Sequence, residues 1–450
     1  MTTPIWDFLL NYRREGMVRF HMPGHKGTAG PLGCEPWDIT EVLGADSLYE
    51  ADGIIAESEA NASALFGYNP TFYSTEGSSQ CIRAMLRLAL MNRPAGTPPV
   101  VAAARNVHKT FIYAAALLDF EVVWLWPEGE SRSLCACPVT AEGLDKVLSS
   151  LDAPPAAVYI TSPDYLGGMA DIAALSEVCR RRGTLLLVDN AHGAYLRFLE
   201  TSRHPLDLGA DMCCDSAHKT LPVLTGGAYL HISKKLPGCF REDAKAALAL
   251  FGSTSPSYLT LASLDLCNRY LAEEGPFHIQ EAAGRMAALK ERLPLWGWSA
   301  SGTEPLKLTL DAAAYGLTGD LAAESLRVDG GIEPEYADRD DVVLMASGAT
   351  GEEAFQALEN ALRGMTAKRP CPRPALPLAK GERVMSIREA VFAPHETVPA
   401  EQSLGRICGA PTVGCPPAIP IAVSGERIGP EAVELFACYG VERVEVLRSI

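Results

Sequence analysis

One lysine, Lys219, lies in the stretch DMCCDSAHKTL, among small, apolar and weakly polar residues that include Ser216 and His218. Lysine side chains usually remain in water, because burying an ammonium group without a partner is costly. A desolvated lysine has a lowered pKa, and its neutral amine can attack a carbonyl carbon. The stretch therefore indicates either a nucleophilic amine or an ordinary solvated loop lysine.

A second candidate group lies in STEGSSQCIRAM, where Gly77 is followed by Ser78 and Ser79. Helical periodicity begins here, so the first N–H groups of the helix and the two hydroxyls would face one point. Such a helix N-terminus favours an anion, and a phosphate group fits. The alternative is an ordinary serine cap.

Two further motifs place polar residues at the ends of apolar strands. Asp189 closes the strand in LLLVDNAHG, with His192 just after it, and His108 begins a helix in AARNVHKTF. A carboxylate at the end of a buried strand needs a cationic or hydrogen-bond-donating partner. Asp189 could instead cap a turn, and a lone histidine is more often structural than catalytic.

Together these signals fit one cofactor. Pyridoxal phosphate requires an anion cup for its phosphate, a carboxylate beside its pyridine nitrogen, a flat group against its ring and a lysine that bonds to its aldehyde. The four groups are supplied by residues 77–79, Asp189, His108 and Lys219. Asp189 and Lys219 are separated by predicted strands, so both can reach one ring from neighbouring strand ends.

The elements that must position these residues alternate between helix and strand from about residue 60 onward. Runs such as VVAAA and LLLVD are apolar along their whole length, and helical patterns such as AALSEVCRRRG separate them. Strands of this kind form a mainly parallel sheet covered by helices on both faces, which is an α/β fold. Ligands of such sheets bind beyond the carboxyl ends of the strands.

The chain of 450 residues is long enough for more than one domain. An amphipathic stretch near the start is followed by a Gly- and Pro-rich segment, which is typical of an arm that packs on something else. The predicted parts are an N-terminal arm (1–60), a large cofactor-binding domain (61–300), a small α+β domain (301–368), a Pro-rich linker (369–380) and a C-terminal domain (381–450).

Composition excludes several classes of protein. Hydrophobic residues make up 48% of the chain and charged residues 21%, as in ordinary globular proteins. The net charge is −16 and no dense block of Lys and Arg occurs, so we expect no nucleic-acid partner. We also expect no membrane segment, no signal peptide and a cytoplasmic location.

The thirteen cysteines are scattered, odd in number and without a C-x-x-C pair, which predicts free and mostly buried thiols. His21 and His25 in HMPGHK have the spacing of metal ligands. Pro23 and Gly24 prevent a regular helix there, however, and no third ligand lies near in sequence. We therefore predict a backbone turn and no metal site.

The motifs resemble those of the bacterial ornithine/lysine/arginine decarboxylases, a family of fold-type-I pyridoxal-phosphate enzymes. PIWDFLLNYRREGMVRFHMPGHKG is similar to the family's N-terminal signature, and STEGSS, RNVHKT, VDNAHGA and DSAHKTL are similar to its phosphate, ring-stacking, aspartate and lysine motifs. TVPAEQSLGRICGAPTVGCPPAIPI is similar to its C-terminal domain. Resemblance covers nearly all of the chain, which looks like the short form without the extra N-terminal domain of the long members.

The resemblance implies decarboxylation of arginine, lysine or ornithine to the corresponding amine and carbon dioxide. It implies that Lys219 binds pyridoxal phosphate covalently, that Asp189 pairs with the pyridine nitrogen and that His108 stacks on the ring. The implied cofactor-binding set is Gly77, Ser78, Ser79, His108, Asp189, His192, Ser216, His218 and Lys219. It also implies a homodimer, or a multiple of one, with the active site at the subunit interface.

Two positions depart from the family's pattern. Asn190 stands where the family often has a second acidic residue, and Glu76 stands where a small or amide side chain is expected near the phosphate. Glu76 could repel the phosphate unless its side chain turns away.

The distal cation of a basic substrate requires carboxylates. Asp46 and Asp164 are the predicted substrate ligands, and Glu50, Asp52 and Glu57 are further candidates. Exposed loop carboxylates are more often merely solvated.

Two other functions stay open, because the cofactor residues do not choose the bond that is broken. One is a fold-type-I enzyme of another reaction, such as an aminotransferase or an aldolase-type lyase, and the other is a catalytically silent regulatory paralogue.

Overall fold

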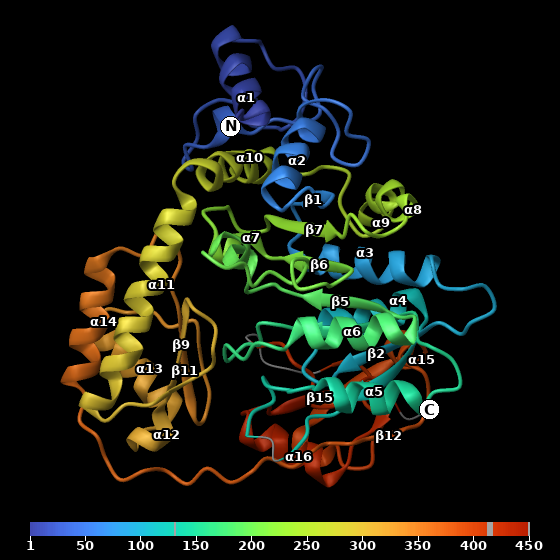
Figure 1. Ribbon diagram of the computed structural model, residues 1–450, viewed down its shortest axis with the longest axis vertical. Helices are drawn as coiled ribbons and strands as arrows, with labels where there is room; N and C mark the ends of the chain where they lie inside the picture. Colours follow the sequence, from blue (N-terminus) through green and yellow to red (C-terminus); the bar gives the residue numbers. More distant parts are fainter. Residues whose placement is uncertain (130–131, 412–416, 449–450) are drawn as a thin grey trace. The chain divides into compact units, whose positions relative to one another are not determined.

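The computed structural model describes residues 1–129, 132–411 and 417–448 (Figure 1). Within these residues, none of the helices combines the length and the apolar character needed to cross a bilayer. The chain divides into two compact units, residues 1–92 with 186–280 and residues 93–185 with 281–450. This division cuts across the predicted large domain, because the chain leaves the first unit after Asn92 and re-enters it at Leu186.

The strands of the first unit carry most of the predicted site at their ends. Strands β5 and β6 are parallel, whereas β7 runs antiparallel to both β6 and β1. Every residue of β6 and β7 is buried, and most of their side chains are apolar. The exceptions include Asp215 and His231, whose side chains contact each other. In spatial order the strands are β1 (Thr71–Ser74), β7 (Ala228–Ile232), β6 (Met212–Asp215) and β5 (Leu185–Asp189).

Helices of the first unit pack on these strands and on one another. Helix α3 contacts β1, β6 and β7, and α2 contacts β1 and α10. The long helix α11 (Gly275–Arg292) begins here and continues beyond the unit. The other helical segments are α2 (Ile54–Leu65), α3 (Ser78–Met91), η2 (Ala194–Phe198), α7 (Ala217–Thr220), α8 (Gly238–Glu242), α9 (Ala244–Ala249) and α10 (Tyr258–Glu273).

The N-terminal arm packs in part on its own unit. Helix α1 (Pro4–Glu15) starts with a proline in its first turn, ends at a left-handed Gly16 and lies against α2 and α10 (Figure 1). The backbone N–H of Trp6 donates to Asp265 Oδ2 at 3.0 Å. Beyond α1 and the short η1 (Glu35–Trp37), the arm exposes large apolar side chains at Met17, Val18, Phe20, Met22, Leu32 and Leu43.

Three parallel strands open the second unit, in the order β4, β2, β3. They are β2 (Val100–Ala104), β3 (Glu121–Leu125) and β4 (Ala157–Thr161), and the helices between and after them are α4 (Lys109–Leu118), α5 (Ala141–Ser149) and α6 (Ile172–Arg182). Asp171 caps the first turn of α6 and Gly183 ends it, as expected of good helix boundary residues.

The predicted α+β character of residues 301–368 agrees with an antiparallel sheet and three helices. The strands, in spatial order, are β10 (Tyr336–Ala337), β11 (Asp341–Met345), β9 (Lys307–Asp311) and β8 (Ala300–Ser301). The helices are α12 (Ala312–Tyr315), α13 (Gly319–Val328) and α14 (Glu352–Gly364), and η3 (Leu293–Trp296) precedes β8.

The C-terminal segment has its own small core, built around Cys408, Phe436 and Val446. Two antiparallel pairs frame it, β12 with β14 and β13 with β15. Its elements are β12 (Glu382–Arg383), α15 (Ile387–Phe392), β13 (His395–Pro399), η4 (Ala400–Gln402), β14 (Glu426–Arg427), α16 (Pro430–Cys438) and β15 (Arg443–Leu447).

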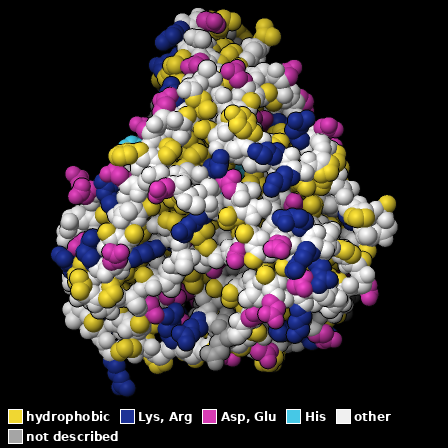
Figure 2. All heavy atoms as spheres, in the orientation of Figure 1, with side chains coloured by type: hydrophobic (Ala, Val, Ile, Leu, Met, Phe, Trp, Pro, Cys, Tyr) yellow, Lys and Arg dark blue, Asp and Glu magenta, His cyan; other side chains and the backbone are white. Residues whose placement is uncertain are grey.

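Two sequence-based expectations concern surface and thiols. On the face drawn in Figure 2, Lys and Arg side chains are interspersed with Asp and Glu side chains. Each cysteine among the described residues is a free thiol, and most of them are buried.

Candidate active site

The loop between β1 and α3 forms the predicted anion cup. Gly77 has φ +70°, a left-handed conformation that favours glycine, and its N–H donates to Gly226 O at 2.8 Å. Ser74 Oγ donates to Gln80 Oε1 at 2.6 Å and accepts the N–H of Glu76 at 3.1 Å. These hydrogen bonds fix the loop conformation before any anion binds.

Two serine hydroxyls meet at the first turn of α3. Ser216 Oγ donates to Ser78 Oγ at 2.8 Å, although the two residues come from the two separate chain segments of the unit. Ser79 follows in the same turn. Apart from Gly77 and its two chain neighbours, no heavy atom lies within 4 Å of the point that a Cβ on Gly77 would occupy. The hydroxyls and the helix N-terminus favour an anion such as a phosphate group here.

The candidate lysine pairs with the candidate histidine of the aspartate motif. Lys219 Nζ lies 3.1 Å from His192 Nε2. His192 is buried, whereas the side chain of Lys219 is exposed, so the lysine is not desolvated as one reading of the sequence required. Since an ammonium group only donates, it donates to Nε2, and the proton of a neutral His192 then resides on Nδ1.

Asp189 ends β5 with its carboxylate buried at 3% exposure. Its Oδ1 accepts the N–H of Ala191 at 3.2 Å and the thiol of Cys214 at 3.7 Å. The predicted strand-end position of this carboxylate is therefore confirmed. Its pairing with a pyridine nitrogen stays a prediction.

His218 is oriented by one backbone carbonyl. Its Nδ1 lies 2.9 Å from Gly227 O, and its backbone N–H donates to the same oxygen at 3.2 Å. Burial lowers the pKa of His218, the hydrogen bond to Gly227 raises it, and the charge of Lys219 lowers it, with a net decrease. The Nδ1 proton faces the carbonyl, so Nε2 can donate to a phosphate only when the ring takes up a second proton.

The carboxylates of the two predicted substrate ligands, Asp46 and Asp164, accept backbone N–H groups of their own loops. The carboxylate of Asp46, a residue with φ +72°, accepts five backbone N–H groups. In the second unit, Asp164 Oδ1 accepts the N–H groups of Leu166 and Gly168 at 2.9 and 2.7 Å, and burial raises its pKa to about 6. The structure gives both residues a loop-forming role that the sequence did not indicate. Their contact with a substrate stays a prediction.

His108 belongs to the second unit, where it caps α4. Its Nδ1 accepts the N–H of Thr110 at 3.2 Å, and the N–H of Lys109 donates to Ala418 O at 2.8 Å. The helix predicted to begin at His108 thus begins at Lys109, because the histidine itself is the cap. Ring stacking by His108 stays a prediction.

Comparison with protein families identifies the family to which these motifs belong. The model of the family "Orn/Lys/Arg decarboxylase, major domain" matches residues 3–297. The chain belongs to the Orn/Lys/Arg decarboxylase family. An arginine decarboxylase of Halalkalibacterium halodurans is 30% identical, over 95% of this chain and 91% of the relative. The resemblance seen in the sequence motifs is therefore confirmed.

Solved structures of decarboxylases and of other pyridoxal-phosphate enzymes share the fold. The constitutive lysine decarboxylase of E. coli aligns with a TM-score of 0.78 at 17% identity, over 99% of this chain and 82% of that chain. An alanine–glyoxylate aminotransferase from Nostoc sp. aligns with a TM-score of 0.54 at 19% identity, over 69% of this chain and 85% of that chain. The predicted fold-type-I α/β class is confirmed.

The two departures from the family's pattern have structural explanations. Glu76 is exposed, and only its backbone N–H takes part in the loop through Ser74. Asn190 is fully buried, and its Nδ2 donates to Asp215 Oδ1 at 2.7 Å. The objection that Glu76 repels the phosphate therefore loses its basis, because the side chain can remain in water.

Sequence reasoning missed the partners of Asp215. His204 and His231 both lie 3.1 Å from its Oδ2, and all three residues are buried. Asp215 could have been noticed, because it directly precedes Ser216 in the lysine motif. The two histidines carry no signal in their spacing.

The other histidine pair, His21 and His25, had the spacing of metal ligands. These two side chains contact separate partners, Tyr12 and Asp38.

We expect His218 to make the affinity for pyridoxal phosphate depend on pH. The lowered pKa of His218 means that the free protein holds the ring neutral near pH 7, whereas a neighbouring phosphate dianion favours the protonated ring. Binding should then take up a proton. We expect the dissociation constant to rise by up to about tenfold per pH unit above about pH 6.5.

Pyridoxine phosphate is a suitable probe because it has no aldehyde, so its binding does not involve the chemistry of Lys219. Titrations from about pH 6 to about pH 8.5 measure the slope, and His218→Gln, which cannot titrate, should flatten it. Equal slopes for the two proteins would show that another group takes up the proton.

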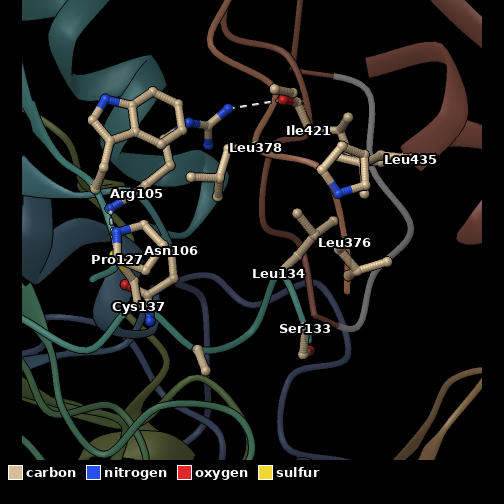
Figure 3. Close-up of a pocket in the computed structure, with 14 residues that line it drawn as sticks. Arg105, Asn106, Pro127, Ser133, Leu134, Cys137, Leu376, Leu378, Ile421 and Leu435 are labelled. Atoms are coloured by element: carbon tan, nitrogen blue, oxygen red, sulfur yellow. Dashed lines mark hydrogen bonds between the residues drawn. The ribbon is translucent and has the colours of Figure 1, made fainter. Parts of the chain in front are cut away.

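A buried arginine ties the segment before His108 to the C-terminal segment (Figure 3). Arg105 donates to Pro420 O at 2.7 Å and to Ile421 O at 2.8 Å, and its guanidinium lies 5.2 Å from the Trp124 ring centroid. A small cavity beside it is lined largely by apolar side chains, among them Leu376 and Leu435. Carbonyl oxygens and an aromatic face therefore solvate the Arg105 charge.

Arg105→Ala should destabilise the protein. The change leaves two buried carbonyl groups unpaired, and hydrogen bonds to charged groups contribute about 1.5 to 3 kcal/mol each. We expect the free energy of unfolding to fall by about 3 kcal/mol, measured by urea denaturation. Arg383→Ala removes an exposed ion pair with Glu121 in the same unit and should change little. Equal effects of the two substitutions would contradict the anchoring role.

Proposed function

We propose that this member of the Orn/Lys/Arg decarboxylase family decarboxylates a basic amino acid to the amine and carbon dioxide with pyridoxal phosphate. The observation that carries the proposal is the convergence of three motifs that are separate in sequence. Ser216, from the lysine motif, meets Ser78 at the N-terminus of α3. Lys219, from the same short segment, contacts His192 of the aspartate motif.

The residues at these strand ends match the parts of the cofactor. Ser78, Ser79, Ser216 and His218 would hold the phosphate at the start of α3, and Lys219 would bond to the aldehyde. When bound, pyridoxal phosphate supplies an electron sink for the electron pair left on Cα as the carboxylate departs. Asp189, a buried carboxylate, would keep the proton on the pyridine nitrogen and so sustain that sink.

The Lys219–His192 pair is placed to move a proton. The Lys219 ammonium donates to His192 Nε2 at 3.1 Å, so either group can carry a proton toward Cα and be reprotonated by the other. His192 is buried and Lys219 is exposed, so the lysine can recover a proton from bulk water. This pair would supply the proton that replaces the lost carboxylate.

Arginine is the first substrate to test, and lysine and ornithine follow. Support for arginine comes from the relative at 30% identity, whose name is arginine decarboxylase. The structural neighbour named lysine decarboxylase is more distant, at 17% identity. Neither name decides the substrate of this chain.

A homodimer with shared active sites completes the proposal. The N-terminal arm exposes several large apolar side chains, including Phe20 at 95% and Leu32 at 82%. Covering such side chains with a second copy would remove apolar surface from water. Analytical ultracentrifugation of the protein would test this part separately.

The deciding experiment incubates the purified protein and pyridoxal phosphate with arginine, lysine and ornithine in parallel, and measures released carbon dioxide and amine. Stoichiometric release of both from one substrate is the expected result. Transfer of the amino group to a keto acid without carbon dioxide would favour an aminotransferase instead. A visible absorption band of the bound cofactor without any turnover would favour a silent paralogue.

A further inference from the structure

A buried network of hydrogen bonds surrounds Asp215, which directly precedes the segment 216–219 that carries Ser216 and Lys219. Its Oδ2 lies 3.1 Å from His204 Nε2 and 3.1 Å from His231 Nε2, and its Oδ1 accepts Asn190 Nδ2 at 2.7 Å. Asp215, His231 and Asn190 are 0% exposed, and His204 is 1% exposed. Three N–H donors therefore converge on one buried carboxylate.

The carboxylate is the charged member of this network. Burial by itself raises the pKa of Asp215, but the two imidazoles outweigh it and hold the pKa below its usual value. Burial lowers the pKa of His231, which favours its neutral form as an Nε2–H donor. A buried carboxylate with three donors is stable, whereas the same carboxylate with fewer donors is costly.

Position along the strands links this network to the site. Asn190 directly follows Asp189 at the end of β5, and Asp215 directly precedes Ser216 at the end of β6. The strands are parallel, and the N–H of Asn190 also donates to Cys214 O at 3.0 Å. The Asn190–Asp215 hydrogen bond therefore joins the carboxyl ends of the two strands from which Asp189 and the segment 216–219 project.

The network also explains the departure at Asn190. An acidic side chain at position 190 would place a second carboxylate against Asp215 Oδ1, where the amide now donates at 2.7 Å. Two such carboxylates repel each other, and one would have to bind a proton. In this chain the amide at position 190 and the carboxylate at position 215 form a matched pair.

We propose that Asp215 is a positioning residue of the cofactor site. Held by His204 and His231, its carboxylate fixes Asn190 and so sets the spacing between Asp189 and the segment that carries Ser216 and Lys219. The proposal rests on the proposed function, because it assumes that pyridoxal phosphate binds between these strand ends.

A metal ion is the competing occupant of this cluster, since its three ligand atoms lie close enough to bind one. Hydrogen bonds already use both carboxylate oxygens and the Nε2 atoms of both imidazoles. The rings are also packed against Phe66, with centroid distances of 4.4 Å for His231 and 5.4 Å for His204. The geometry therefore favours a hydrogen-bonded network, and metal content becomes one outcome of the test.

A charge-swap cycle tests the proposal with Asp215→Asn, Asn190→Asp and the double variant. In the double variant, the new amide at position 215 would be flanked as the carboxylate is now: its oxygen can accept both imidazoles, and its nitrogen can donate to the new carboxylate at position 190. Asp215→Asn alone instead removes the negative charge from the network, and Asn190→Asp alone places two carboxylates against each other. We expect each single variant to weaken pyridoxal-phosphate binding about tenfold or more, and the double variant to return within about threefold of the parent.

The visible spectrum of the bound cofactor distinguishes a change in cofactor position from a change in the stability of the fold. The absorption maximum of the lysine-bound cofactor, and the pH midpoint of its titration, should shift in both single variants and return in the double variant. Asp265→Asn is the matched control, because Asp265 is another buried carboxylate of the same unit, bonded to Ser58 and to the Trp6 N–H. It should lower the melting temperature without moving the spectrum.

Each remaining outcome overturns the proposal. Single variants that lose stability but keep the parent's affinity and spectrum would make Asp215 merely structural, as would a double variant without rescue. One equivalent of copurified metal, whose removal by a chelator reproduces the loss of cofactor, would make the cluster a metal site. If the parent protein binds no pyridoxal phosphate, the proposed function itself fails. The spectrum of the parent protein therefore distinguishes that failure from failure of the positioning role alone.

Discussion

Lys219→Ala is expected to lower turnover by at least about a thousandfold and to remove the visible absorption band of the bound cofactor. Lys219 follows Ser216, whose hydroxyl donates to Ser78, by three residues, and its Nζ lies 3.1 Å from His192 Nε2. In the proposed reaction this amine bonds to the aldehyde and also supplies a proton. Loss of the side chain therefore removes both the covalent attachment and the proton. Steady-state release of carbon dioxide and an absorption spectrum across the near-ultraviolet and visible range measure the two effects.

Two further variants test the assignment of Lys219. Lys219→Arg keeps a cation within reach of His192 but cannot bond to an aldehyde under ordinary conditions, so it should lose the band and the turnover alike. Lys234→Ala removes an exposed lysine of the same unit that donates to Gly67 O, and should leave both unchanged. A Lys219→Ala protein that released carbon dioxide at the parent's rate would contradict the assignment of the lysine.

The strand-end motifs could be predicted from sequence because each is local. A buried parallel strand is apolar along its length, so its end is visible as the first polar residue, and Asp189 was found in this way. The helix that begins at Ser78 was visible through its periodicity, and the glycine before it marked the loop. Short distances between such ends then follow from the sheet itself.

Other parts of the structure depend on partners that are remote in sequence. His231 lies opposite Cys213 in the β6–β7 pairing, and only this register brings it near Asp215. Strand β1 was missed because its four residues, TFYS, are too few for a clear pattern. The loop-forming role of Asp46 could not be predicted, because sequence does not reveal how many backbone N–H groups a loop will direct at one side chain.

Asp189→Asn is expected to lower turnover by about a hundredfold or more while leaving cofactor attachment intact. The amide oxygen can still accept the N–H of Ala191, so the end of β5 should keep its conformation. The substitution removes the negative charge that favours a proton on the pyridine nitrogen. Turnover should therefore fall through kcat rather than through KM, because the charge matters most when electrons move into the ring.

Asp211→Asn is the matched control for this variant. Asp211 Oδ2 accepts the N–H of Leu186 at 2.8 Å, near the start of the same strand β5, away from the carboxyl end that carries Asp189. Its loss should affect stability more than kcat. An Asp189→Asn protein that kept kcat within about threefold of the parent would show that the ring nitrogen needs no charged partner here. The electron sink would then have to be sustained by another group, and the reaction assigned to the chain would need a different electrostatic basis.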